Sequence, residues 1–211
     1  MVELSHEETR VLGCLIEKQH TTPDAYPMTV NALRLACNQA TNRDPVVDFE
    51  ETAVREAAQR LGRRGWARFT SGAGSRTAKY RHVLDQALGL PHDELVILAT
   101  LMLRGAQTPG ELKGRSDRLH AFADLAAVDD ALERLIARDL VVRLPRRPGQ
   151  KEERYEHALG SQEAGTVAPS PTPSSNVDEE VGLDARVERL EDEMASLREA
   201  LDALRKELGA S

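Results

Sequence analysis

One stretch of the sequence gathers residue types that bind phosphate. Between Ala57 and Leu84 there is no aspartate or glutamate, and seven arginine and lysine residues give this stretch a charge of +7. Cations that gather without acids attract a polyanion such as nucleic acid. The alternative is a solvated surface whose arginines pair with acids elsewhere, such as Glu50, Glu51 or the C-terminal segment. The seven residues are Arg60, Arg63, Arg64, Arg68, Arg76, Lys79 and Arg81.

The residues that lead into this stretch follow a helical pattern. With the apolar residues Val54, Ala57 and Leu61 on the inner face, the opposite face carries arginine, glutamine and threonine, and Glu56 is its one acid. Such side chains can read base edges or hold phosphates. We therefore expect nucleic-acid contact from Thr52, Arg55, Gln59, Arg60, Arg63, Arg64, Arg68, Arg76 and Lys79.

An internal repeat organises the first 160 residues. The segment Leu4-Ser5-His6-Glu7-Glu8 returns as Leu90-Pro91-His92-Asp93-Glu94. Further on, Lys79-Tyr80-Arg81-His82 matches Arg154-Tyr155-Glu156-His157. The offset between the copies falls from 86 to 75 residues along the chain, which indicates an insertion in the first copy. We infer a duplicated domain with one modest core in each copy.

Each copy is expected to form three helices followed by a β-hairpin. In the first copy, Ser5 and Glu8 have the spacing of a capping box at a helix start. After Trp66 the apolar pattern changes to a period of two, and Gly72-Ala73-Gly74 supplies a turn. Three helices and a hairpin make a winged helix. The expected fold class is therefore mainly α with small β-hairpins (α+β), with two tandem winged-helix domains followed by a linker and a C-terminal coiled-coil helix.

The third helix of the second copy presents different chemistry. Its predicted outer face carries three carboxylates and only one arginine. Phosphates would repel a face with this excess of carboxylates. The cations of the second hairpin are followed directly by Glu152 and Glu153. We therefore expect DNA contact from the first copy only. The outer face consists of Ala126, Asp129, Asp130, Glu133, Arg134 and Ala137.

Other residues that could do chemistry do not form a recognisable site. The histidines occupy equivalent repeat positions, which indicates shared structural roles, and the spacings of a zinc site are absent. Cys14 and Cys37 lie in apolar helical stretches, which is typical of core residues. The glycines at 72 and 74 lack the third glycine of a phosphate loop. We expect no enzymatic activity, no metal and no cofactor.

Several segments resemble a known family. They include Cys14-Leu15-Ile16-Glu17-Lys18-Gln19, Tyr26-Pro27-Met28-Thr29-Val30-Asn31, Thr41-Asn42-Arg43-Asp44-Pro45-Val46 and Leu103-Arg104-Gly105-Ala106-Gln107-Thr108-Pro109-Gly110-Glu111-Leu112. These segments are similar to the YceH-like family of uncharacterised bacterial proteins, over essentially the whole chain. The resemblance implies tandem winged-helix domains. It implies no activity and no catalytic or ligand residue.

The C-terminal segment has the spacing of a coiled coil. Its apolar residues follow one another at intervals of 4-3-4-3-4-3-4, an a/d seam that favours self-association as a homodimer. In a parallel pair of two chains, Arg186 of one chain would face Glu191 of the other. The alternative is a single amphipathic helix that folds back onto the rest of the chain. The seam consists of Leu183, Val187, Leu190, Met194, Leu197, Leu201, Leu204 and Leu208.

The net charge of −7 lies entirely in residues 161–211, which carry 5 basic and 12 acidic residues. We expect winged-helix domains at 1–88 and 89–160, a Pro/Ser-rich linker at 161–177 and the coiled-coil helix at 178–211. The chain starts without the basic and apolar regions of a secretory signal, and no apolar stretch is long enough to span a bilayer. A cytoplasmic protein without membrane contact is expected.

Two functions remain open from the sequence. The first is a non-enzymatic, DNA-binding or regulatory protein that contacts double-stranded DNA through the first copy and self-associates through its C-terminal helix. The second is a protein-interaction module whose winged helices bind partner proteins without DNA. The acidic third helix of the second copy favours the second function.

Overall fold

The computed structural model describes residues 3–70, 78–146 and 152–160. These residues form helices and small antiparallel sheets, which confirms the predicted α+β class. Arg76, the predicted linker at 161–177 and the helix at 178–211 with its eight heptad residues lie outside the described residues.

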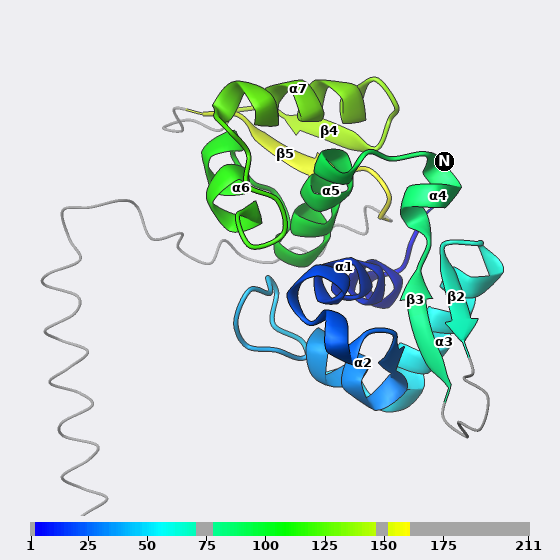
Figure 1. The fold of residues 1–211 in the computed structure, drawn as a ribbon. Coiled ribbons are helices and arrows are strands. Elements are labelled where there is room, and N and C mark those ends of the chain that lie inside the picture. Colours follow the sequence, from blue (N-terminus) through cyan, green and yellow to red (C-terminus); the bar gives the residue numbers. More distant parts are fainter. Residues whose placement is uncertain (1–2, 71–77, 147–151, 161–211) are drawn as a thin grey trace, which may run out of the picture. The chain divides into compact units, whose positions relative to one another are not determined.

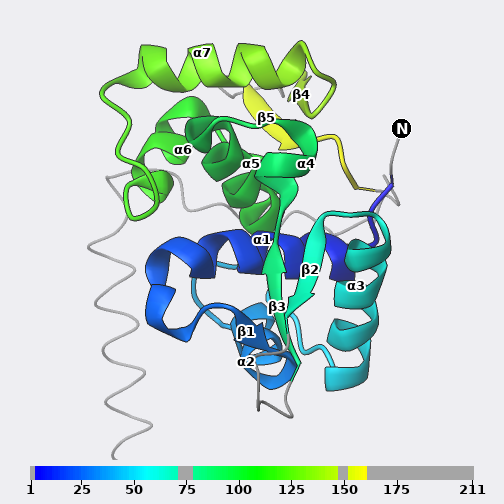
Figure 2. The same cartoon turned by 45° about the vertical axis from the view of Figure 1, so that its right-hand side comes forward.

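The first copy contains three α-helices and a three-stranded antiparallel sheet of order β1-β3-β2. Figure 1 shows β2 and β3 beside α3, and Figure 2 also labels β1. The two-residue strand β1 was not predicted, because its sequence is too short to show a period. The elements are α1 (His6–Thr21), the 3-10 turn η1 (Pro23–Ala25), β1 (Met28–Thr29), α2 (Val30–Cys37), α3 (Glu51–Arg63), β2 (Ala67–Thr70) and β3 (Lys79–His82).

The second copy repeats this order, as the sequence repeat predicted. A single antiparallel bridge between Gln107 and Tyr155 stands where β1 pairs with β3 in the first copy. The short helix α4 (Leu84–Leu88) connects the copies and was not predicted. The boundary predicted after residue 88 falls at its end and stays a prediction. The other elements are α5 (His92–Arg104), α6 (Pro109–Ser116), α7 (Leu125–Ile136), β4 (Val141–Leu144) and β5 (Arg154–His157).

The predicted capping box at the start of α1 is confirmed. The Ser5 hydroxyl accepts from the backbone N–H of Glu8, and the Glu8 carboxylate accepts from the backbone N–H of Ser5 at 2.8 Å. Thr108 and Glu111 make the same reciprocal pair at the start of α6. Each pair satisfies two N–H groups that a helix start would otherwise leave without a partner.

Helices α1 and α5 are the centre of the fold. Every residue of α1 from Glu8 to Glu17 is buried, and so is every residue of α5 from Glu94 to Leu103. Figure 2 shows α1 between α5 on one side and α2 and α3 on the other. The sequence predicted one apolar stripe on each helix. More residues of each helix are buried than the predicted stripe contains, because other elements cover these helices on all sides. Residues 1–162 form one compact unit.

The insertion of the first copy lies between α2 and α3 and is held by two buried arginines. Arg10 donates to the carbonyl oxygens of Cys37 at 3.2 Å and Pro45 at 2.6 Å. The Arg43 side chain is fully buried and pairs with Glu17, with 2.6 Å between Nη2 and Oε2. An insertion that sequence alone leaves as turns is therefore fixed to α1 by charged groups.

The histidines at the ends of β3 and β5 occupy equivalent places, as their repeat positions predicted. His82 pairs across the ladder with Ala67, and His157 with Val141. Both ring nitrogens of His82 and Nδ1 of His157 are buried without a hydrogen-bond partner in the described part of the chain. Burial lowers the pKa of each histidine to about 4, from an ordinary value of 6.5. For His82 this effect outweighs the carboxylate of Asp85, at 3.8 Å from Nδ1.

These two histidines predict a loss of stability in mild acid. Between pH 6.5 and 4 the unfolded chain binds a proton at each histidine that the folded chain does not bind, so stability falls as the pH falls through this window. At pH 5 the loss is about 2 kcal/mol for each histidine, relative to pH 7.5. Urea unfolding at the two pH values measures it. The variant His157→Gln should reduce the pH-dependent difference by about 2 kcal/mol, and an undiminished difference would contradict the assignment.

None of the described helices is long and apolar enough to cross a membrane.

Candidate nucleic-acid interface

The outer face of α3 is built as the periodicity predicted. Val54, Ala57, Ala58 and Leu61 are buried against the core. The predicted outer residues are exposed except Arg60, which is half-buried. Part of their charge is already balanced, because Arg55 forms an ion pair with Glu51 on the same helix. The exposed residues are Thr52, Arg55, Glu56, Gln59 and Arg63.

Two of the predicted contact residues are bound to a buried acid. The carboxylate of Glu8 is 3% exposed and lies 3.3 Å from Nε of Arg60 and 3.6 Å from Nε of Arg64. Arg64 also donates to the backbone oxygen of Glu3 at 2.9 Å. Pairing with acids elsewhere was the alternative to nucleic-acid contact, with Glu50, Glu51 and the C-terminal segment as examples. For Arg60 and Arg64 the acid in the described part of the chain is Glu8. These two arginines attach α3 to the start of α1.

The same arrangement occurs in the second copy. Glu94 lies 2.6 Å from Nε of Arg134 and 3.3 Å from Nη1 of Arg138. In the repeat register Glu94 corresponds to Glu8, and the two arginines correspond to Arg60 and Arg64. A feature shared by both copies indicates a structural role. The repeat could have revealed it, because all three positions match between the copies.

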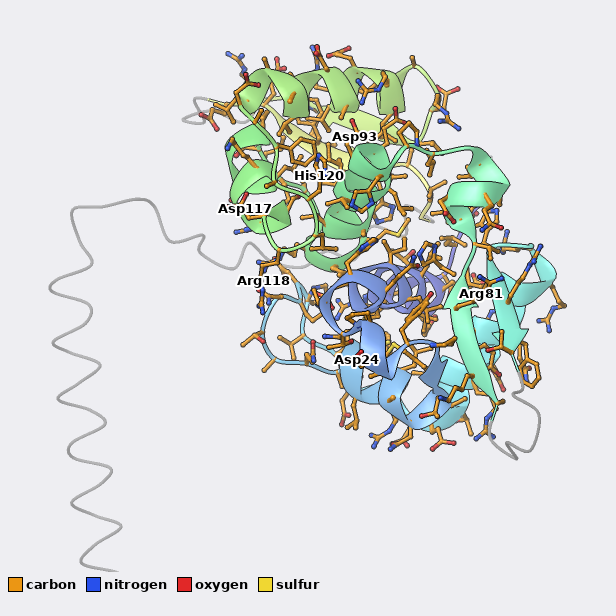
Figure 3. All side chains as sticks on the ribbon, in the orientation of Figure 1. Asp24, Arg81, Asp93, Asp117, Arg118 and His120 are labelled. Carbon is orange, nitrogen blue, oxygen red and sulfur yellow. The ribbon has the colours of Figure 1, made fainter. Side chains whose placement is uncertain are left out.

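The cations left for a ligand in the first copy lie mainly on its hairpin. Arg68 on β2 stands directly opposite Arg81 on β3, and Thr70 stands opposite Lys79. Figure 3 shows Arg81 on β3 beside β2. Since opposite residues of a ladder point to the same side, the three cations share one face of the hairpin. Arg81 was part of the acid-free stretch but was not predicted as a contact residue.

The other face of this hairpin is aromatic. Phe69 stands opposite Tyr80, and the two rings meet edge to face with 5.8 Å between their centroids. Tyr80 is buried, whereas Phe69 is 60% exposed. Tyr80 belongs to the core on this face. On the cationic face Arg68 and Lys79 are exposed, whereas Arg81 is half-buried and its Nε is buried.

The second hairpin carries different residues at the matching places. Val142 stands opposite Glu156 where the first copy has Arg68 and Arg81. Arg143 is paired with Glu133 of α7, and its Nε lies 3.4 Å from Glu153. The described cations of this hairpin, Arg143, Arg146 and Arg154, are therefore paired with carboxylates. The two hairpins share one backbone arrangement and differ in charge.

Helix α7 has the acidic outer face that the sequence predicted. Its six predicted outer residues are all exposed. Burial, and then the carboxylates of Glu133 and Asp130, raise the pKa of Asp129 above its ordinary value. The one arginine of this face, Arg134, is paired with Asp93 and Glu94.

The cysteines are both buried with free thiols, as predicted for core residues. Within the described residues, no group of three His, Cys, Asp or Glu side chains is placed to hold a metal ion.

Similar proteins identify the family. A sequence model described as "Protein of unknown function, DUF480" matches residues 4–150. The UPF0502 protein of Cronobacter sakazakii is 45% identical over 215 aligned residues, which cover 98% of each chain. The chain belongs to this family. The UPF0502 proteins YceH of Salmonella typhimurium and Salmonella agona are each 44% identical, with the same coverage. The predicted resemblance to YceH-like proteins is thereby confirmed.

The DUF480 and YceH descriptions state no substrate and no partner. A function for this member of the family has to be argued from its own surfaces.

Proposed function

We propose that this chain is a cytoplasmic, non-enzymatic protein that binds double-stranded DNA through its first copy. Helices α1 to α3 and strands β2 and β3 would act as a winged helix, and the second copy as a further winged helix without DNA contact. Support comes from the element order and from the sheet order β1-β3-β2, in which the hairpin packs beside α3.

The pairing of Arg68 with Arg81 carries the proposal. Like charges directly opposite in an antiparallel ladder repel and cost stability. Lys79 adds a third cation on the same face. A phosphate backbone along this face would remove the repulsion, and a wing commonly contacts the backbone in this way. Gln59 and Arg63, exposed on α3, would then reach the major groove.

Binding to a random-sequence duplex tests this proposal. We expect the full chain to bind with an affinity that falls steeply with salt, because each neutralised phosphate releases counterions. Arg63→Glu and Arg76→Glu should each weaken binding and reduce the slope of log affinity against log salt by about 1. Fluorescence anisotropy over a salt series measures both quantities.

The matched control is Arg146→Glu, because this exposed arginine lies beside the second hairpin and pairs with Glu153. It makes the same change of charge and should leave duplex binding unaltered. The absence of measurable binding at low salt would remove the proposal, and so would equal effects of the three variants.

The C-terminal helix is proposed to join two chains into a homodimer through its heptad seam. We expect light scattering to give a dimer mass for the full chain and a monomer mass for a truncated chain that ends at Gly160. The eight apolar seam residues supply the association energy. Equal monomer masses for both chains would contradict the coiled coil and favour a helix that folds back.

A protein-interaction role is the second candidate. Leu125 at the start of α7 is 50% exposed and lines a surface pocket together with Asp129 of the acidic face. An exposed apolar side chain beside a carboxylate fits a basic protein partner. If the full chain binds no duplex at low salt, this role becomes the leading one.

A further inference from the structure

A cavity of about 210 Å³ is lined by none of the residues proposed above to contact DNA. Its wall is formed by the C-terminal half of α1, the insertion between α2 and α3, and helices α5 and α6. Three arginines line it: Arg104 at the end of α5, Arg115 on α6, and Arg118 just after α6. Figure 3 shows Arg118 between α6 and the insertion.

The charge of this wall is not balanced. Glu17 is the one carboxylate among the described residues that line the cavity, and it already binds Arg43 at 2.6 Å and Lys18 at 3.3 Å. Arg115 lies 3.6 Å from Glu111 and donates to Gln107. An excess of guanidinium groups therefore remains at the cavity.

Arg104 has a defined position in this wall. It donates to the side-chain oxygen of Asn42, whose backbone takes the left-handed conformation with φ of 61°. Asparagine is one of the few residues that adopt this conformation readily. Burial, and then the charges of Arg115 and Arg43, lower the pKa of Arg104. The guanidinium is held among other cations by a neutral oxygen atom, Oδ1 of Asn42.

We propose that this cavity binds a small anion that carries a phosphate or carboxylate group. Guanidinium groups bind both through paired N–H donors, and several of them around one cavity would otherwise repel one another. The volume of about 210 Å³ lies below the roughly 300–1,000 Å³ of typical ligand pockets, which fits a small anion. This inference does not rest on DNA binding.

Calorimetric titration of the full chain tests the proposal. The probes are inorganic phosphate, 2-phosphoglycolate and malonate, with sodium chloride of equal ionic strength as the reference. We expect one saturable site per chain for at least one probe. Binding by the phosphate compounds alone assigns a phosphate site, and binding by malonate alone assigns a carboxylate site. Heats that match sodium chloride for all three probes would overturn the proposal.

Variants separate the cavity from other cationic surfaces. Arg118 is exposed, so the variant Arg118→Gln should fold normally. Its affinity for the probe should be about tenfold lower than that of the original chain. Arg104→Lys keeps the charge but removes the paired donors, and should also weaken binding. The control Arg63→Gln removes an exposed arginine of α3 and should bind the probe as the original chain does. Unchanged binding by both cavity variants, or equal weakening by the control, would overturn the assignment.

Discussion

Replacement of Glu17 by alanine is expected to destabilise the folded chain by about 3–5 kcal/mol. Glu17 is the carboxylate partner of Arg43, whose side chain is fully buried. Without it, a guanidinium charge stays in the interior with only neutral oxygen atoms around it. Burial alone would raise the pKa of Glu17, but the hydrogen bonds and charge of Arg43 outweigh burial and hold the pKa below its ordinary value. The pair is therefore ionised at neutral pH.

Two controls show whether the loss comes from the uncompensated charge. The exposed pair of Glu51 and Arg55 lies on the surface, so Glu51→Ala should cost less than about 1 kcal/mol. The double variant Glu17→Met with Arg43→Met removes both buried charges and should recover much of the loss. Chemical unfolding measures all three. A cost for Glu17→Ala no larger than that of Glu51→Ala would contradict the buried ion pair.

Replacement of Gly13 by leucine is expected to force α1 and α5 apart. A Cβ atom at Gly13 would lie 3.0 Å from Cγ and Cδ2 of Leu103 and 3.2 Å from Cβ of Met102. A leucine side chain has no room there, and overpacking of this kind costs about 1–3 kcal/mol or more. A fall of the melting temperature reports the cost.

A second glycine separates packing from helix propensity. Gly62 also lies in a helix, but the nearest atom to its Cβ position, the backbone oxygen of Ala67, is 3.9 Å away. Gly62→Ala should therefore stabilise the chain by up to about 1 kcal/mol, the usual gain in helix propensity. Gly13→Ala should gain less, because the close contact opposes it. Equal stabilisation by both alanines would show that α1 and α5 do not need the glycine.

The repeat made most of the fold predictable. Matching segments set the order of elements in both copies, and the capping residues Ser5 and Glu8 marked a helix start that the structure confirms. Strand β1 and helix α4 were missed because such short elements show no period. The full burial of α1 was missed for a different reason. A sequence shows which helix face is apolar, but not that a second helix, α5, covers the remaining face.

The sequence predicted where the cations of the candidate interface lie, but not which of them pair with an acid. The acid-free stretch correctly located exposed Arg63, Arg68 and Lys79. It could not show that Arg60 and Arg64 are bound to Glu8, some 50 residues away in the chain. Nor could it show that Arg81 stands opposite Arg68, because strand register depends on the hairpin turn. The heptad seam and Arg76 lie outside the described residues, so their roles stay predictions.

The difference in charge between the two hairpins suggests that the two copies bind different partners. Within the described residues, the first hairpin presents Arg68, Lys79 and Arg81 without an ion pair, and the second hairpin presents ion-paired or acidic residues. On our proposal, the first copy contacts DNA, and the second is free to contact a protein. The C-terminal helix would then bring two such bodies together.

The most direct test of the DNA proposal exchanges the residues of one hairpin for those of the other. In the full chain, Arg68→Val with Arg81→Glu copies the pair that the second hairpin carries, Val142 with Glu156. We predict that this double variant, with an unchanged circular dichroism spectrum, binds a random duplex at least about tenfold more weakly at low salt, with a salt slope reduced by about 2. The same affinity and salt slope as the original chain would contradict the account.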